Sequence, residues 1–92
     1  MLYVIFCIDK PGNEQVRLDH YEAHKAYLAT APYRTVMSGP LVTDDDKTMN
    51  GSFFLVESDS RKEIEQFVEN DPFNQAGIWE SKWIRAFRKR VG

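Results

Sequence analysis

Two segments of this chain carry apolar side chains at consecutive positions, which strongly limits the folds open to it. Leu2–Ile8 has the sequence LYVIFCI, and Ser52–Ser58 has the sequence SFFLVES. Both are rich in β-branched and aromatic residues, and turn residues flank them, so they are predicted to be strands. A strand with one face in water alternates apolar and polar residues. Because these two do not, we expect both faces of their sheet to be covered.

A helix is predicted after the strand at Leu2–Ile8. Asp19 followed by Glu22 has the spacing of a capping box, which places the helix start at Asp19. Pro32 ends the helix after Ala31. Apolar residues recur at helical spacing and form one stripe that also contains His24: Leu18, Tyr21, Leu28 and Ala31.

Two further strands and a second helix are predicted after Pro32. Arg34–Val42 is predicted to be an edge strand with a break or bulge near Gly39–Pro40. After the strand at Ser52–Ser58, either Asp59 or Ser60 is expected to cap a second helix.

A short helical turn and a last strand complete the chain. Asp71 followed by Pro72 predicts a fresh helix start with Asp71 at the N-cap, and Gly77 ends the turn. Ile78–Phe87 is then the last strand, with its large aromatic side chains at alternating positions: Trp79, Trp83 and Phe87.

The element order is strand, helix, strand, strand, helix, strand. This order predicts an α+β, ferredoxin-like domain in which both helices cover one face of an antiparallel sheet. The 92 residues form a single domain, 1–92, with no residues left over to cover the other face. A second copy of the chain is the natural cover, so we expect a homodimer.

Composition argues against several functional classes. The net charge of -2 argues against nucleic acid as the main partner. No run of about 20 apolar residues is present, so no membrane span is expected. Cys7 is the single cysteine, which leaves no internal disulfide and no zinc spacing. Since the first residues also lack the features of a secretory leader, we expect a cytoplasmic protein, and no sequence motif calls for a cofactor.

His24 and Asp71 are the residues most suited to chemistry. A histidine on an apolar stripe can exchange protons, and a carboxylate can orient it. Each also has a structural interpretation, His24 as a packed side chain and Asp71 as a helix cap. His20, four residues before His24, allows a shared metal, but no third ligand lies at a motif spacing, so no metal site is predicted.

Two further residues are candidates for substrate binding. Arg17, placed just before the predicted helix, can contact a carboxylate of a substrate or form a surface ion pair. Tyr27, one turn from His24, can line the same cleft or pack in the core.

Several motifs, taken together and in order, resemble the YciI-like family. They are the opening LYVIFCIDKP, Arg17-Leu18, His24 with Leu28, Ser38-Gly39-Pro40-Leu41, Asn50-Gly51-Ser52, Asp71-Pro72-Phe73, Ala76-Gly77 and Phe87. The resemblance implies a dimeric α+β barrel with a histidine–aspartate pair in a cleft, by position His24 and Asp71. Ser38 and Gly39 are expected at that cleft as binding residues. Tyr21-Glu22 replaces an arginine–proline pair common in the family, a departure expected at the cleft entrance.

Two functions follow as hypotheses. Relatives in this group include muconolactone isomerase and a chloromuconolactone dehalogenase. The first hypothesis is therefore a small cofactor-free enzyme that uses His24 and Asp71 for general acid–base chemistry on a small lactone or carbonyl compound. The alternative is a non-catalytic, dimeric ligand-binding or accessory module that uses the same cleft.

Overall fold

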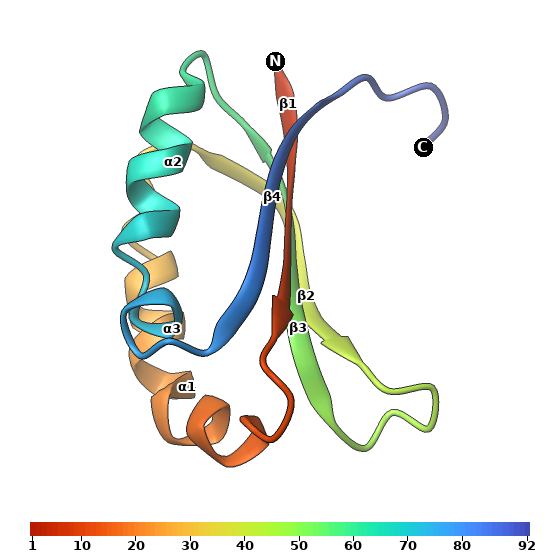
Figure 1. The fold of residues 1–92 in the computed structure, drawn as a ribbon. Coiled ribbons are helices and arrows are strands. Elements are labelled where there is room, and N and C mark those ends of the chain that lie inside the picture. Colours follow the sequence, from red (N-terminus) through yellow and green to blue (C-terminus); the bar gives the residue numbers. More distant parts are fainter.

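The computed structural model describes residues 1–92 as one antiparallel sheet with three helices on one of its faces (Figure 1). The sheet order is β2-β3-β1-β4, and every neighbouring pair is antiparallel. The elements along the chain are β1 (Leu2–Asp9), α1 (Glu14–Leu28), β2 (Arg34–Val42), β3 (Met49–Glu57), α2 (Arg61–Glu69), α3 (Pro72–Gln75) and β4 (Trp79–Phe87). This arrangement confirms the predicted ferredoxin-like fold. None of the helices has the length and apolar character needed to span a membrane.

The start of α1 differs from the sequence prediction. The helix begins at Glu14, after a turn in which Gly12 has a φ of +82°, a conformation that favours glycine. Asp19 is therefore inside the helix, where its side chain accepts a hydrogen bond from Gln15, and the predicted capping box is wrong. The earlier start also changes which side chains face inward, because Arg17 is buried while Leu18 is exposed.

The later caps agree with the sequence. Ser60, one of the two expected residues, caps α2 by accepting the backbone N–H of Glu63. Asp71 caps α3 with Pro72 at the first helical position, as predicted. Gly77 follows with a φ of +70°, which lets the chain turn into β4.

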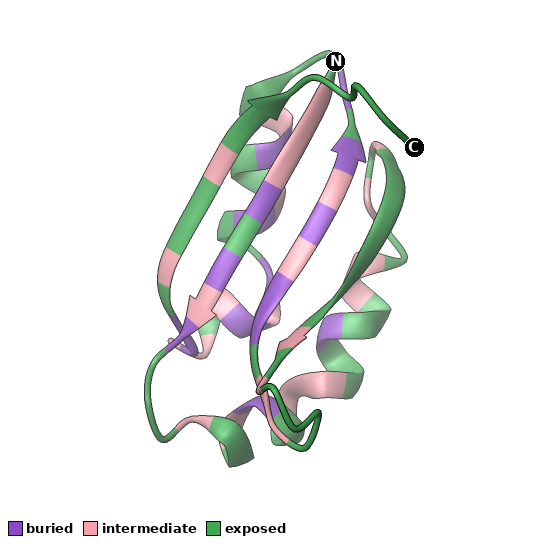
Figure 2. Cartoon of the chain, turned by 90° about the vertical axis from the view of Figure 1, so that its right-hand side faces the viewer, coloured by how far each residue is buried: buried purple, intermediate pink, exposed green.

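The core lies between the sheet and the helices. It contains nine buried apolar residues: Ile5, Cys7, Phe54, Val56, Ile64, Val68, Phe73, Ile78 and Trp79. The burial pattern of the sheet follows from this layer, since the central strands β1 and β3 hold the buried positions while β2 and β4 are mostly exposed (Figure 2).

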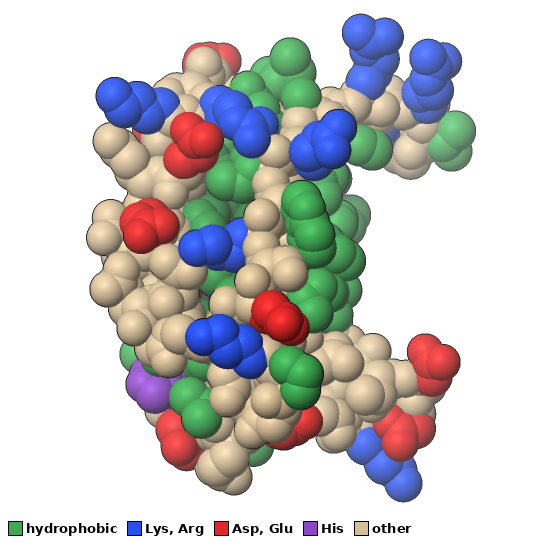
Figure 3. All heavy atoms as spheres, in the orientation of Figure 1, with side chains coloured by type: hydrophobic (Ala, Val, Ile, Leu, Met, Phe, Trp, Pro, Cys, Tyr) green, Lys and Arg blue, Asp and Glu red, His purple; other side chains and the backbone are tan.

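The opposite face of the sheet, here called the open face, is covered by no element of the chain. Its side chains are largely apolar, and hydrophobic groups gather along that side of the molecule (Figure 3). By strand register it contains Leu2, Val4, Phe6, Ile8, Met37, Leu41, Phe53, Leu55, Trp83 and Phe87. This bears out the expected two-sided character of β1 and β3.

Irregular strand pairing changes two details of the prediction. The register shifts between Ile8 and Asp9, so Trp79 pairs with Asp9 and is buried on the helix side. Trp83 and Phe87 lie on the open face, and the prediction that all three aromatic residues share one face is wrong for Trp79. In the edge strand β2 one irregularity falls between residues 41 and 42, close to the expected position near Gly39–Pro40, and a second, which was not expected, falls between residues 35 and 37.

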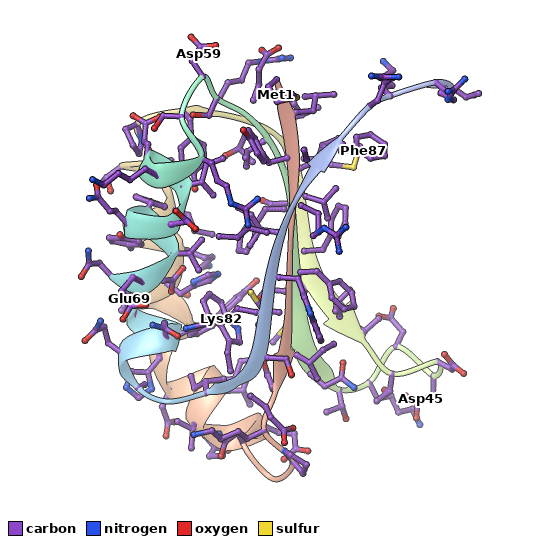
Figure 4. All side chains as sticks on the ribbon, turned by 45° about the horizontal axis from the view of Figure 1, so that its top comes forward. Met1, Asp45, Asp59, Glu69, Lys82 and Phe87 are labelled. Carbon is purple, nitrogen blue, oxygen red and sulfur yellow. The ribbon has the colours of Figure 1, made fainter.

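Side chains of β4 that face the helices tie the two layers together. Lys82 of β4 donates a hydrogen bond from its Nζ atom to the side-chain amide oxygen of Asn74, at 2.6 Å. The same Nζ atom lies 3.9 Å from a carboxylate oxygen of Glu69 (Figure 4). Asp45 lies in the β2–β3 loop, which projects away from the layers on the side of the open face.

Candidate active site

A cleft of about 230 Å³ lies where α1 passes over the edge of the sheet. Its walls come from α1, the middle of β2 and the neighbouring part of β3. The lining residues are Arg17, Tyr21, His24, Lys25, Leu28, Ser38, Gly39, Pro40, Ser52 and Phe54. A cleft of this size accommodates a molecule with a single small ring rather than a polymer.

His24 lines this cleft, and Asp71 lies behind it as its hydrogen-bond partner. The helical stripe of α1 turns His24 toward the sheet, and the capping position at the start of α3 holds Asp71 beneath it. The Nδ1 atom of His24 lies 2.8 Å from Oδ1 of Asp71, and both side chains are buried. The same Oδ1 atom accepts the backbone N–H of Phe73, also at 2.8 Å. Asp71 is therefore both a helix cap and a partner of His24.

The pairing fixes which ring nitrogen of His24 is available to a ligand. A carboxylate only accepts hydrogen bonds, so Nδ1 of His24 carries the proton that is donated to Asp71. In the neutral ring, Nε2 then carries the lone pair. No protein group is hydrogen-bonded to Nε2, and His24 lines the cleft. The arrangement can accept a proton from a molecule in the cleft and return it.

Phe73 holds the His24 ring in its orientation. The two rings are stacked, with centroids 3.8 Å apart and planes inclined by 8°. The guanidinium carbon of Arg17 lies 4.5 Å from the centroid of the same Phe73 ring. Trp79 packs edge-on against His24 at 6.4 Å. These aromatic contacts restrict the imidazole to one position and limit the water around it.

Arg17 is part of a buried polar cluster rather than a surface pair. Its Nε and Nη2 atoms donate to the two carboxylate oxygens of Asp9, at 2.6 and 3.0 Å, and Nη2 also donates to Ser52 Oγ at 2.8 Å. Its Nη1 atom has no hydrogen-bond partner. The alternative of a surface ion pair is therefore wrong, since the pair with Asp9 is buried, and Arg17 lines the cleft as the substrate-binding interpretation requires.

The other predicted binding residues divide into two groups. Ser38 and Gly39 line the cleft from β2. Tyr27 does not line it, because its ring stacks on Phe67 at 4.3 Å and its hydroxyl donates to the Phe67 carbonyl oxygen at 2.7 Å. Burial raises the pKa of Tyr27, as does the nearby Asp71 carboxylate. Tyr27 joins α1 to α2 instead.

Sequence reasoning missed several cleft residues. Lys25 follows His24 directly, and its ammonium lies 4.8 Å from the ring centroid of Tyr21. Tyr21-Glu22, which replaces the arginine–proline pair of the family, was expected at the cleft entrance. Tyr21 lines the cleft, which confirms this expectation for Tyr21. Asp9 and Ser52 hold Arg17 in place. The helical stripe through His24 had already identified Tyr21, whereas the Asp9–Arg17 pair depends on where α1 starts.

The remaining titratable candidates lie outside this arrangement. Nδ1 of His20 lies 2.9 Å from the Val16 carbonyl oxygen, and no cluster of three or more potential metal-ligating side chains occurs in the structure. Cys7 is fully buried in β1, and burial raises the pKa of its thiol to about 12. A neutral, buried thiol is a poor nucleophile.

The sequence matches a family model almost from end to end. The model of the YCII-related domain covers residues 1–88. Protein YciI of Escherichia coli O6:H1 is 29% identical over 96 residues, covering 97% of this chain and 98% of that protein. An uncharacterised protein of Haemophilus influenzae is 28% identical over the same shares. The expected family resemblance is confirmed.

Solved structures extend the comparison. The 5-chloro-2-hydroxyhydroquinone dehydrochlorinase TftG from Burkholderia phenoliruptrix AC1100, in complex with 2,5-dihydroxybenzoquinone, is 40% identical with a TM-score of 0.87. The match covers 96% of this chain and 94% of that one. An EthD family protein from Bacillus halodurans C-125 has a TM-score of 0.55 at 15% identity, covering 96% and 99%. The fold is thus that of dimeric α+β barrel proteins.

Proposed function

From the premise that this chain belongs to the YCII-related domain family, we propose that it is a small enzyme that performs acid–base chemistry without a cofactor. One observation carries the proposal: His24 lines the cleft, its Nδ1 atom is joined to the buried Asp71 at 2.8 Å, and its Nε2 atom has no protein hydrogen-bond partner. The likeness to a dehydrochlorinase over nearly the whole chain supports the same type of reaction.

The proposed reaction is elimination or isomerisation on a small ring compound that carries a carbonyl or enol group, such as a lactone or a hydroxylated quinol. Nε2 of His24 removes a proton from the substrate, and the released electron pair forms the new double bond. In an elimination from a chlorinated hydroxyquinol, one ring hydroxyl first passes its proton to the carbon that carries chlorine, which gives the keto form. Nε2 of His24 then removes the proton of another hydroxyl and chloride leaves with the electrons of its bond to carbon, so HCl is lost without an oxidant or reductant. In an isomerisation, His24 returns the proton to another carbon. Asp71 stabilises the imidazolium formed in between.

The walls of the cleft position the substrate in this proposal. Arg17, Ser38 and Gly39 are the binding residues, and Phe54 and Leu28 provide the apolar surface for a ring. Tyr27 is not given a binding role in this proposal, because it does not line the cleft.

The proposed assembly is a homodimer formed through the open face. Apolar side chains occupy this face along all four strands, and Phe6 and Trp83 form an exposed aromatic pair with centroids 5.5 Å apart. A monomeric protein rarely exposes a continuous apolar surface of this kind. A second copy packed sheet to sheet covers it and gives the dimeric barrel of the related structures.

Chloride release from 5-chloro-2-hydroxyhydroquinone tests the function. We expect wild-type protein to release chloride, measured with an ion-selective electrode, and His24→Gln to reduce the rate at least 100-fold because it removes the base. His20→Gln is the matched control, since His20 lies on the same helix outside the cleft.

Binding without turnover would favour the alternative. If wild-type protein binds 2,5-dihydroxybenzoquinone but neither releases chloride nor isomerises muconolactone, the cleft belongs to a ligand-binding or accessory module. Equal rates in wild type and His24→Gln would refute the assignment of His24 as the base.

A further inference from the structure

The cleft presents donors and one accessible cation, but no carboxylate. Its ten lining residues include Arg17, His24 and Lys25 and no Asp or Glu, although the whole chain has a net charge of -2. The charge of Arg17 is balanced by Asp9, whose two oxygens accept hydrogen bonds from it, and its remaining nitrogen, Nη1, is buried without a partner. Arg17 is 0% exposed, whereas the side chain of Lys25 is 50% exposed, so Lys25 is the solvent-accessible cation of the lining.

Lys25 lies at the rim of the cleft. Its side chain is 50% exposed, and its ammonium lies 4.8 Å from the centroid of the Tyr21 ring, which also lines the cleft. This places a positive charge one residue away from His24 along α1. Ser38 and Ser52 contribute hydroxyl groups to the other wall.

The carboxylates nearby compete only weakly with a ligand for Lys25. Glu22 lies 3.1 Å from Lys25 Nζ, but its side chain is 88% exposed, so solvent screens the pair. Asp71 lies behind His24 and is occupied by the imidazole and the backbone of Phe73. A negative oxygen of a ligand can thus replace Glu22 as the partner of the ammonium.

We infer that the cleft selects anionic ring compounds and that Lys25 is the residue that binds their negatively charged oxygen. This inference rests on the proposed function of the cleft as a small-molecule site. The ligand class is a small ring with an ionised hydroxyl group, such as an enolate or a hydroxyquinone anion. Lys25 holds that oxygen while a second group of the ring faces Nε2 of His24. A charge-assisted hydrogen bond to an ammonium distinguishes such an anion from a neutral ring of the same shape.

Titration calorimetry with two matched probes tests the inference. The anionic probe is 2,5-dihydroxybenzoquinone, whose hydroxyl groups are vinylogous acids that ionise at neutral pH. The neutral probe is 2,5-dimethoxybenzoquinone, which has the same ring and no ionisable hydroxyl. We expect wild-type protein to prefer the anion, and Lys25→Gln to weaken binding of the anion by about tenfold, the effect of one charge-assisted contact. Binding of the neutral probe should change less than about twofold, since no charge is lost from that complex.

Two further variants sharpen the test. Glu22→Gln removes the competing carboxylate and should tighten binding of the anion, while Lys62→Gln, on the exposed surface of α2, should leave it unchanged. Raising the salt concentration should weaken the anion's binding to wild type more than to Lys25→Gln.

The inference is overturned if wild type does not bind the anion, if it shows no preference for the anion, or if Lys25→Gln affects both probes equally. These outcomes are independent of chloride release. A cleft that binds the anion through Lys25 without turnover would refute the proposed enzyme and leave the inference standing.

Discussion

Replacing Asp71 by asparagine and by alanine separates its two roles. The Oδ1 atom of Asp71 accepts hydrogen bonds from the backbone N–H of Phe73 and from Nδ1 of His24, each at 2.8 Å. Asparagine keeps a carbonyl oxygen in this place and remains a good N-cap, so both bonds persist without the negative charge. Alanine removes both bonds and leaves two buried donors without partners.

The expected losses of stability differ clearly between the two variants. Loss of an N-cap costs about 1 kcal/mol, and a buried donor without a partner costs about 1–3 kcal/mol. Asp71→Ala should therefore lower the free energy of unfolding by about 2–4 kcal/mol. Asp71→Asn should lower it by only about 1 kcal/mol, since it exchanges charged hydrogen bonds for neutral ones.

The expected losses of activity are similar in the two variants. Both remove the charge that stabilises the imidazolium of His24, so chloride release should fall at least about 100-fold in each. Urea denaturation measures the first effect and initial rates measure the second. Equal destabilisation by both substitutions would refute the capping argument, and near wild-type rates in Asp71→Asn would show that the charge of Asp71 has no part in the chemistry.

Three other properties can be tested in the same way. Burial raises the pKa of Cys7 from 9.0 to about 12, so the contribution of the neutral thiol to the free energy of unfolding should be fully present below pH 9 and fall by up to about 4 kcal/mol as the pH rises to 12. In urea denaturation, the free energy of unfolding of a Cys7→Ala variant should decline less steeply with pH. An equally steep decline in both proteins would contradict this. Phe6→Glu should convert a dimer into a monomer in light scattering, whereas Leu18→Glu, also exposed but on α1, should not. A monomeric wild type at low micromolar concentration would disprove the sheet-to-sheet assembly. Gly51→Ala should destabilise the protein by about 1–3 kcal/mol in urea denaturation, because a Cβ there would lie 2.6 Å from the Cys7 carbonyl oxygen. In the control Gly39→Ala, the new Cβ meets nothing within 4 Å, so the loss should be less than about 0.5 kcal/mol. Similar losses in the two variants would contradict this account.

Much of the fold follows from local patterns. The apolar composition of β1 and β3 predicted a sheet covered on both faces, and the structure leaves the open face apolar. Asp71-Pro72 predicted a helix start because a cap and a proline are a local signal within two residues. These features depend on side chains only a few positions apart, so the sequence is sufficient to find them.

The errors occur where local signals compete. The Asp19-Glu22 spacing suggested a cap, but the turn at Gly12 allowed α1 to begin at Glu14 and to extend its hydrogen bonding over Asp19. The bulge opposite Asp9 likewise moved Trp79 to the helix side, although strict alternation placed it with Trp83. The first outcome accompanies the burial of Arg17 and the second the burial of Trp79, and burial in the assembled domain cannot be read from a short window of sequence.

The sequence alone determined the order of strands and helices, the family, and the two residues suited to acid–base chemistry. Only the tertiary structure decided that His24 and Asp71, 47 positions apart, share a hydrogen bond, and that Arg17 is buried against Asp9 while Tyr27 points away. The physical reason is that periodicity and capping act within one element. The partners of a buried polar group are set by how the elements pack, because leaving such a group without a hydrogen bond costs free energy.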